Sequence, residues 1–161
     1  MHPRATALIE ILGLIPHPEG GYFSEVFRSG AHVQPDDGRP RRAALTTIYF
    51  LLPAGEVSRW HRVSSDEVWH YYEGDPLELW LADREFSDVA AHRLGPVGSA
   101  TVPVRVAPAN QWQAARTMGA YTLVGCTVGP GFDFVDFMLL RDLPVEAAEA
   151  ARRSADVARF V

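Results

Sequence analysis

The sequence predicts an all-β protein, a barrel or sandwich with short helices only at its ends. About nine short runs rich in β-branched and aromatic residues follow one another at close spacing, separated by Gly, Pro, Asp and Ser. No alternation of strands and helices and no Gly-rich phosphate loop occurs, which excludes Rossmann and P-loop folds. The 161 residues suit one domain, with a barrel core at about 20–140.

The elements follow in a simple order along the chain. An amphipathic helix is expected over Ala5–Leu12, before a break at two prolines and a Gly pair. A second helix is expected over 144–160, with Pro144 at its first position. Residues 29–43 are rich in Gly, Pro and charge and indicate a long polar loop. The expected strands are 21–28, 44–52, 58–63, 67–74, 76–82, 101–107, 111–115, 120–128 and 132–140.

Composition limits the possible partners. Hydrophobic residues make up 47% and charged residues 22%, as in soluble globular proteins, and the net charge is −5. This balance argues against nucleic acid and membrane surfaces as partners. The single Cys126 lies in an apolar run, so we expect a small buried residue. The N-terminus has no signal-peptide or membrane-span pattern, and a cytoplasmic location is expected.

A spaced set of residues in the middle of the chain matches a known motif. Gly55, His61, Val63, Glu67 and Gly74 keep every spacing of G-x5-H-x-H-x3-E-x6-G, and Val63 replaces the second His. Further on, "PANQWQ" is similar to P-x-G-x2-H, with Asn110 for Gly and Gln113 for His. These are the two motifs of the cupin superfamily, and the chain resembles a cupin.

The closer resemblance is to an RmlC-like branch of cupins catalogued as a domain of unknown function. It is carried by "HPEGGYFSE", "TTIYFLL", "HRVSSDEVWHYYEGDPL" and "LVGCTVGPGFDF", which span most of the chain. The resemblance implies a double-stranded β-helix, or jelly-roll barrel, with a ligand cavity between its sheets. It also implies a homodimer, and we expect the outward faces around Trp60, His70, Tyr72 and Trp80 to offer surface to the partner.

Alternation along the strands predicts which side chains face the barrel interior. Residues two apart in a strand share a face, so Arg59 accompanies His61. On the next strand Glu67, Trp69 and Tyr71 share a face. We therefore expect these side chains to line the interior, opposite the second motif.

The motif positions argue against a tightly held metal. A typical cupin metal site has three His and one carboxylate, but Val63 cannot coordinate and the amide of Gln113 is a weak donor. His61 and Glu67 alone leave too few protein ligands for a transition metal. We therefore expect no metal and no other cofactor.

An acid–base function is the first alternative that remains. RmlC-like sugar epimerases use a barrel histidine as base and a tyrosine as acid, and His61 and Tyr71 are the candidates here. Glu67 could orient the imidazole, and Gln113 could donate a hydrogen bond to substrate. Whether the protein is an enzyme stays open; if it is, proton transfer of the isomerase or epimerase type is expected.

Recognition without catalysis is the second alternative. The expected ligand is a small polar organic molecule, such as a sugar derivative or a carboxylate, and its proposed contacts are Arg59, Trp69, Trp112 and Gln113. The aromatic residues suit a stacking surface and core packing equally well. A small-molecule binding or sensing protein fits the same residues, and a metal-dependent cupin oxygenase fits them least.

Two acidic segments have less specific interpretations. In "HPEGG", Glu19 could lie near the cavity mouth beside His17, although the Gly pair more simply supplies a turn. In "GPGFDFVDF", Asp133 and Asp136 lie three residues apart in an expected strand and should face opposite sides, which argues against a carboxylate pair.

Overall fold

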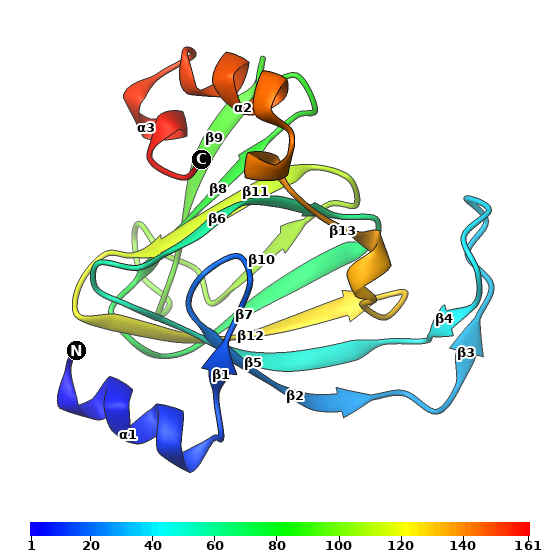
Figure 1. Ribbon diagram of the computed structural model, residues 1–161. Coiled ribbons are helices and arrows are strands. Elements are labelled where there is room, and N and C mark those ends of the chain that lie inside the picture. The colour runs from blue at the N-terminus through cyan, green and yellow to red at the C-terminus, as the bar shows by residue number, and fades with distance from the viewer.

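The computed structural model describes residues 1–161 and contains two antiparallel sheets packed face to face, with helices at the chain ends (Figure 1). The helices are α1 (Pro3–Ile11), α2 (Pro144–Ala151) and α3 (Ala155–Ala158), and two 3-10 turns cover Phe134–Asp136 and Leu140–Asp142. The strands are β1 (Ile15–Pro16), β2 (Tyr22–Arg28), β3 (His32–Val33), β4 (Arg42–Ala43), β5 (Thr46–Pro53), β6 (Val57–Val63), β7 (Asp66–Gly74), β8 (Leu77–Ala82), β9 (Val89–Leu94), β10 (Val104–Ala107), β11 (Trp112–Thr117), β12 (Tyr121–Gly129) and β13 (Phe137–Leu139).

The order of strands in the sheets confirms the all-β class. The first sheet has the order β1-β2-β5-β12-β7-β10, and the second has the order β13-β6-β11-β8-β9. Strands adjacent in space are often distant in sequence, as β5 and β12 are, so the sheets are woven together rather than built from successive hairpins. The short strands β3 and β4 form a separate pair.

The main core lies between the two sheets and follows the two-residue period of the strands. In β5, Phe50 and Leu52 point to the interior, where they meet Leu77 and Leu79 of the opposite sheet. Leu51, between them in sequence, points outward and is covered by α1. Each face of this sheet therefore buries its own set of apolar residues.

The outer face of the second sheet is covered by the C-terminal helices, as Figure 1 shows. Trp60 of β6 is fully buried there with Phe160, and Trp80 packs against the same cluster. The expectation that Trp60 offers surface to a partner is therefore wrong, and Trp80 is partly buried. Tyr72, on the other sheet, is exposed.

Several elements differ from the sequence prediction, and the short strands β1, β3 and β4 lie where none were expected. The expected C-terminal helix is two helices, because the Ser154 side chain accepts a hydrogen bond from the backbone N–H of Val157 and starts α3 afresh. The expected strand 132–140 is a 3-10 turn followed by β13, with Asp133 capping the turn. The edge strand β9 was not predicted, because "VAAHRL" lacks a strong β pattern. No helix is long and apolar enough to cross a membrane.

The polar segment 29–43 projects from the barrel as an arm that contains β3 and β4 (Figure 1). Two of its arginines fasten it to the body. Arg42 donates hydrogen bonds of 2.8 and 2.9 Å to the two carboxylate oxygens of Asp136, and Arg39 donates one of 3.0 Å to the same carboxylate. Asp136 therefore serves the arm and not a carboxylate pair with Asp133.

Candidate functional site

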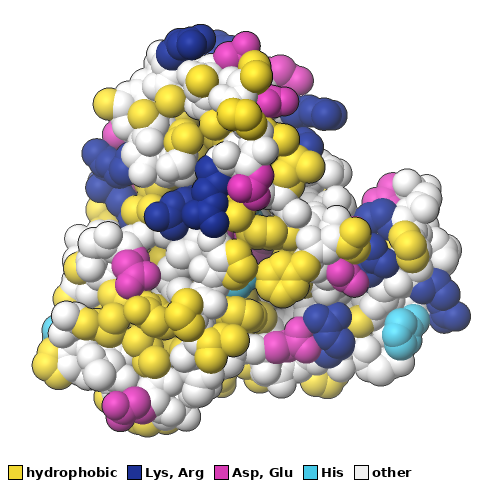
Figure 2. Space-filling model, viewed as in Figure 1, with side chains coloured by type: hydrophobic (Ala, Val, Ile, Leu, Met, Phe, Trp, Pro, Cys, Tyr) yellow, Lys and Arg dark blue, Asp and Glu magenta, His cyan; other side chains and the backbone are white.

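A cavity of about 250 Å³ opens at one end of the barrel. Strands β2, β5, β6, β7 and β12 supply its walls, together with the loop before β2 and the segment before β13. On the face in Figure 2, hydrophobic side chains are exposed between the two layers of the molecule, beside an adjoining acidic and basic pair. The loop "HPEGG" contributes His17 and Glu19 to the lining of this cavity.

This loop is pinned against β6 by close backbone approach. The backbone N–H of Arg59 donates a hydrogen bond of 2.9 Å to the carbonyl of Glu19. Gly20 has a φ of +113°, and a Cβ built on it would collide with the backbone carbonyl of Val57. Only glycine accepts both constraints. The Gly pair therefore does more than turn the chain, because it brings Glu19 against β6 beside His61.

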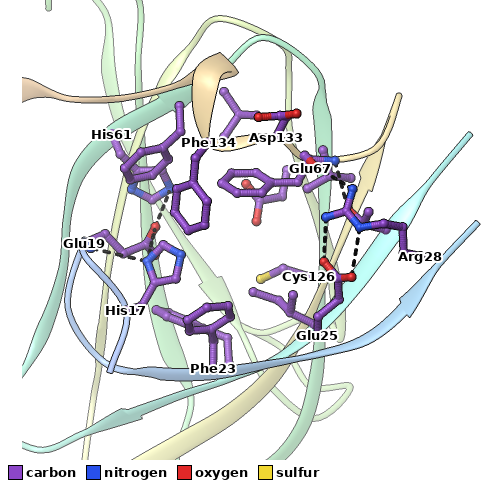
Figure 3. A pocket seen from close by; sticks show the side chains of 17 residues that line it. His17, Glu19, Phe23, Glu25, Arg28, His61, Glu67, Cys126, Asp133 and Phe134 are labelled. Atoms are coloured by element: carbon purple, nitrogen blue, oxygen red, sulfur yellow. Dashed lines mark hydrogen bonds and ion pairs between the residues drawn. The ribbon is translucent and has the colours of Figure 1, made fainter. Parts of the chain in front are cut away.

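Glu19 lies between two histidines at one end of the cavity, as Figure 3 shows. Its Oε2 is 3.3 Å from Nδ1 of His17 and 3.3 Å from Nε2 of His61. Its other oxygen, Oε1, accepts a hydrogen bond of 2.8 Å from the hydroxyl of Ser58. All three ionisable side chains are at most 7% exposed.

The hydrogen bonds determine where protons can lie in this cluster. Nδ1 of His61 is 2.8 Å from the backbone carbonyl of Arg59, which can only accept, so Nδ1 carries a hydrogen. In the neutral ring Nε2 then presents a lone pair to Glu19. A carboxylate also lacks a hydrogen to donate, so this contact is a hydrogen bond only when one proton is shared between the two groups.

Burial favours the uncharged form of each group. It raises the pKa of Glu19, although His17 and the Ser58 hydrogen bond oppose the change. It lowers the pKa of His61, opposed by Glu67 and by the Arg59 carbonyl. It also lowers the pKa of His17, opposed by Glu19. Burial therefore disfavours a separated imidazolium–carboxylate pair and favours one proton shared between Glu19 and Nε2 of His61.

A second carboxyl group faces the cavity from β7. Gln113 donates a hydrogen bond of 2.5 Å to Oε2 of Glu67, and Trp69 donates one of 2.9 Å to the Gln113 oxygen. Burial raises the pKa of Glu67, and the thiol of Cys126 lies against it. Burial also raises the pKa of Cys126 well above its ordinary value, so this thiol is not an activated nucleophile.

Phenylalanine side chains form most of the remaining wall. Phe23 meets His17 edge to face at 4.6 Å between ring centroids, and Phe137 lies 5.4 Å from the ring of His61. At the mouth, on the far side of the cavity from Glu19 in Figure 3, Arg28 is paired with Glu25 at 2.7 Å. The histidines and Glu19 therefore occupy a mostly apolar pocket closed by one ion pair.

Among the expected site residues, His61 and Glu67 reach the cavity, whereas the other five do not. Trp69 and Gln113 are buried behind Glu67, where they hold its carboxyl group. Arg59 points a guanidinium nitrogen to the Glu19 carbonyl, 3.3 Å away.

Tyr71 and Trp112 lie farther from the site. Tyr71 lies on the interior face, as expected, and packs against the main core, but its hydroxyl donates a hydrogen bond of 2.6 Å to the carbonyl of Gly74 and does not reach the cavity. Trp112 belongs to the cluster under the C-terminal helices, on the opposite face of β11 from Gln113.

The orienting partner of His61 also differs from expectation. Glu67 acts on the imidazole through its charge, but no hydrogen bond joins them. The ring is held instead by the Arg59 carbonyl and Glu19. The repeated glycine after "HPE" is the one sequence signal for this role, because a close backbone approach requires it.

The donor set does not fit the metal centre known in other cupins. At the motif positions, Val63 offers no ligand atom and the Gln113 oxygen accepts from Trp69. Nε2 of His61 faces the Glu19 carboxyl group at 3.3 Å rather than an open position, and no three His, Cys, Asp or Glu side chains are arranged to hold an ion. We therefore assign no metal-dependent step to this site.

Glu67→Gln is expected to stabilise the protein at pH 8. Because burial raises the pKa of Glu67 in the fold, ionising it costs stability as pH rises from 4.5 through the higher folded value. Gln cannot ionise, so we expect the free energy of unfolding to rise by on the order of 1 kcal/mol at pH 8. This gain should vanish below the ordinary pKa of a glutamic acid. Urea unfolding across this pH range measures it.

The exposed Glu85 supplies the control, because Glu85→Gln removes the same charge outside the cavity. An equal gain in unfolding free energy in both variants would contradict the raised pKa of Glu67. A gain in Glu67→Gln that grows as pH falls would contradict it too.

Comparison with known proteins identifies the family of this chain. Residues 6–140 match the family model described as Cupin superfamily (DUF985). A hypothetical protein from Leishmania major is 36% identical, with a TM-score of 0.78 over 83% of this chain and 85% of that one. A protein from Shewanella oneidensis is 33% identical, with a TM-score of 0.76 over 84% of this chain and 83% of that one.

More distant structures share only the fold. Oxalate decarboxylase from Bacillus subtilis is 12% identical, with a TM-score of 0.59 over 80% of this chain and 30% of that one. No curated protein matches the sequence. The motif spacing, the paired sheets and the family match over most of the chain lead to one conclusion: this chain belongs to the DUF985 family of the cupin superfamily.

Proposed function

We propose that this cupin binds a small organic molecule in its cavity and moves a proton on it, as isomerases and epimerases do. The observation that carries the proposal is Glu19, whose buried carboxyl group lies 3.3 Å from ring nitrogens of both His17 and His61 at the cavity wall. Buried, coupled acid–base groups in a pocket are typical of proton-transfer sites.

The pair His61–Glu19 contains the two groups that an isomerisation needs. A carbonyl compound exchanges the hydrogen on the adjacent carbon when a base removes it while an acid protonates the carbonyl oxygen. Nε2 of His61 can accept the carbon-bound proton, and the Glu19 carboxylic acid can give its proton to the oxygen. The product is a neutral enol beside an imidazolium–carboxylate pair, and the reverse transfers complete the reaction.

The surroundings support this assignment. Ser58 and the Arg59 carbonyl hold the two groups in place without competing for the cavity side. The phenylalanine walls make the surroundings of these groups apolar, which strengthens electrostatic interactions inside the cavity. Glu67 faces the same space and offers a further hydrogen-bond partner for an oxygen of the ligand.

Recognition without turnover is the second candidate, and the position of Tyr71 favours it. The epimerase hypothesis needs a tyrosine opposite the histidine, but the Tyr71 hydroxyl is bound to the carbonyl of Gly74 outside the cavity. In this case His61 and Glu19 only hydrogen-bond the ligand. The two candidates differ in whether a carbon–hydrogen bond is broken.

Hydrogen exchange in D₂O tests this difference, because it reports removal of the proton whatever product is formed. The protein would be incubated with aldoses, ketoses, cyclic ketones and 2-oxo acids, and loss of the α-proton signal followed by NMR. We expect exchange above background for at least one compound, and a fall of about 10²–10⁴-fold in His61→Asn.

His92→Asn is the matched control, because His92 lies on the edge strand β9 outside the cavity. An equal loss in both variants would show that the exchange does not depend on the site. No exchange with any compound, together with binding that requires His61, would replace the catalytic proposal with the recognition candidate.

A further inference from the structure

We propose that the cavity selects a ligand that is uncharged at neutral pH: a single ring or similar apolar body bearing a carbonyl or hydroxyl group, and not a carboxylate, phosphate or nucleotide. This rests on the proposed function, because it names the substrate class of the same site. The inference narrows the sugar derivatives and carboxylates expected from the sequence.

The charges of the cavity carry the first step. Four acidic side chains line it, Glu19, Glu25, Glu67 and Asp133, against the single guanidinium of Arg28. An anion that leaves water for this cavity would lose its hydration and meet carboxyl groups. It would need a free cation inside to offset both costs.

Arg28 is not free to play this part. Its Nε and Nη2 donate hydrogen bonds of 2.9 and 2.7 Å to the two carboxylate oxygens of Glu25, and its Nη1 donates one of 3.0 Å to the carbonyl of Phe132. Each of its three nitrogens already has an acceptor, and Glu25 balances its charge. An anionic ligand would meet a guanidinium whose charge Glu25 already balances.

No other arginine reaches the cavity. Arg42 is committed to Asp136 at the base of the arm. Arg62 lies on the outer face, with its guanidinium 5.0 Å from the centroid of the Trp112 ring. The basic patch that a diphosphate-bearing sugar nucleotide would require is therefore missing from the site.

The walls and the volume carry the second step. Five phenylalanines line the cavity, and at about 250 Å³ it lies just below the range of about 300–1,000 Å³ that suits drug-sized ligands. Such a space suits one ring. A cation would also have to leave water for these apolar walls, and two of the acids already have partners, Glu25 in Arg28 and Glu67 in Gln113.

The polar groups that remain suit a neutral ligand. Glu19 and His61 lie 3.3 Å apart, and with one proton between them they can together both donate to and accept from a carbonyl or hydroxyl group. Glu67 holds one oxygen against Gln113 and keeps its other oxygen for the cavity. An uncharged carbonyl or hydroxyl group on a ring fulfils these contacts without bringing a charge.

Benzamide, benzoate and benzylammonium test the inference, because they share one ring and a similar size and differ in charge. Titration into ¹⁵N-labelled protein at pH 7.5, followed by NMR, would give each dissociation constant and show whether cavity residues shift. We expect benzamide to bind at least about tenfold more tightly than either ion, a difference of about 1.4 kcal/mol. In Glu67→Gln, benzoate should gain affinity relative to benzamide, because a carboxyl group that repels it is gone.

Several results would overturn the inference. Benzoate or benzylammonium could bind as tightly as benzamide, or benzoate binding could disappear in Arg28→Gln, which would show that Arg28 leaves Glu25 to receive an anion. Absence of benzamide binding at millimolar concentration would overturn it too. Hydrogen exchange confined to 2-oxo acids would refute the ligand class while supporting proton transfer, and benzamide binding with no exchange on any compound would do the reverse.

Discussion

Glu19→Gln is expected to reduce hydrogen exchange on a carbonyl substrate by at least about 10²-fold. The amide has the shape of the carboxyl group and can still accept the 2.8 Å hydrogen bond from Ser58. It has no proton to give to a carbonyl oxygen, and its NH₂ group can occupy the lone pair of His61 permanently. The measurement is the exchange rate at saturating substrate over the pH range 5–9.

Ser58→Ala provides the matched comparison at the other oxygen of Glu19. It removes the hydrogen bond but leaves the acid, and this bond opposes the rise in the pKa of Glu19. We therefore expect Ser58→Ala to keep most of the exchange rate. The pH profile of exchange should shift to higher pH, because Glu19 holds its proton to a higher pH. Exchange that survives in Glu19→Gln with an unchanged profile would remove Glu19 from the chemistry.

The regular spacing of strands and motifs explains why much of the architecture could be predicted from the sequence. The two-residue period in "SRWHRV" predicts that His61 faces the barrel interior and Trp60 the outer face of the sheet, and the structure confirms both positions. The same rule puts Glu67 in the cavity. Where alternation is unbroken and one face is buried, local pattern is enough to assign a side chain to its side of the sheet.

Non-local contacts explain most of what the sequence did not predict. Glu19 reaches His61 only because the loop before β2 is hydrogen-bonded to β6, about forty residues later in the chain. Tyr71 keeps the expected interior face and packs against the main core, but it lies four residues beyond Glu67 on β7 and does not reach the cavity. The alternation rule gives the side of the sheet on which a side chain lies, and not its distance from the cavity along the strand.

The position of Trp112 could have been predicted from the alternation of side chains along a strand. Trp112 and Gln113 are adjacent in β11, so they cannot share a face, and the structure buries them on opposite sides of the second sheet. An interior Gln113 therefore required Trp112 to pack outside. The split of the C-terminal helix also had a local sign, because Ser154 followed by an apolar residue three positions later is a common helix start.

Trp60→Ala is expected to destabilise the protein by about 3–5 kcal/mol, the largest stability effect that we predict for one side chain. Trp60 is fully buried, with ring centroids 5.1 Å from Phe86 and 5.9 Å from Phe160. Its indole N–H donates a hydrogen bond of 2.9 Å to the carbonyl of Val157. The truncation removes this bond and leaves a cavity between β6 and α3. Urea unfolding measures the free-energy change.

Trp60→Phe separates packing from the hydrogen bond, and it keeps the prediction testable if the alanine variant does not fold. It retains an aromatic ring against Phe86 and Phe160 but leaves the Val157 carbonyl without its donor, so a smaller cost of about 1–3 kcal/mol is expected. Val145→Ala, on the exposed side of α2, should change stability little. A Trp60→Ala cost no larger than that of Val145→Ala would contradict this packing. Because His61 is the next residue on β6, the layer that Trp60 anchors also fixes the strand from which the cavity histidine projects.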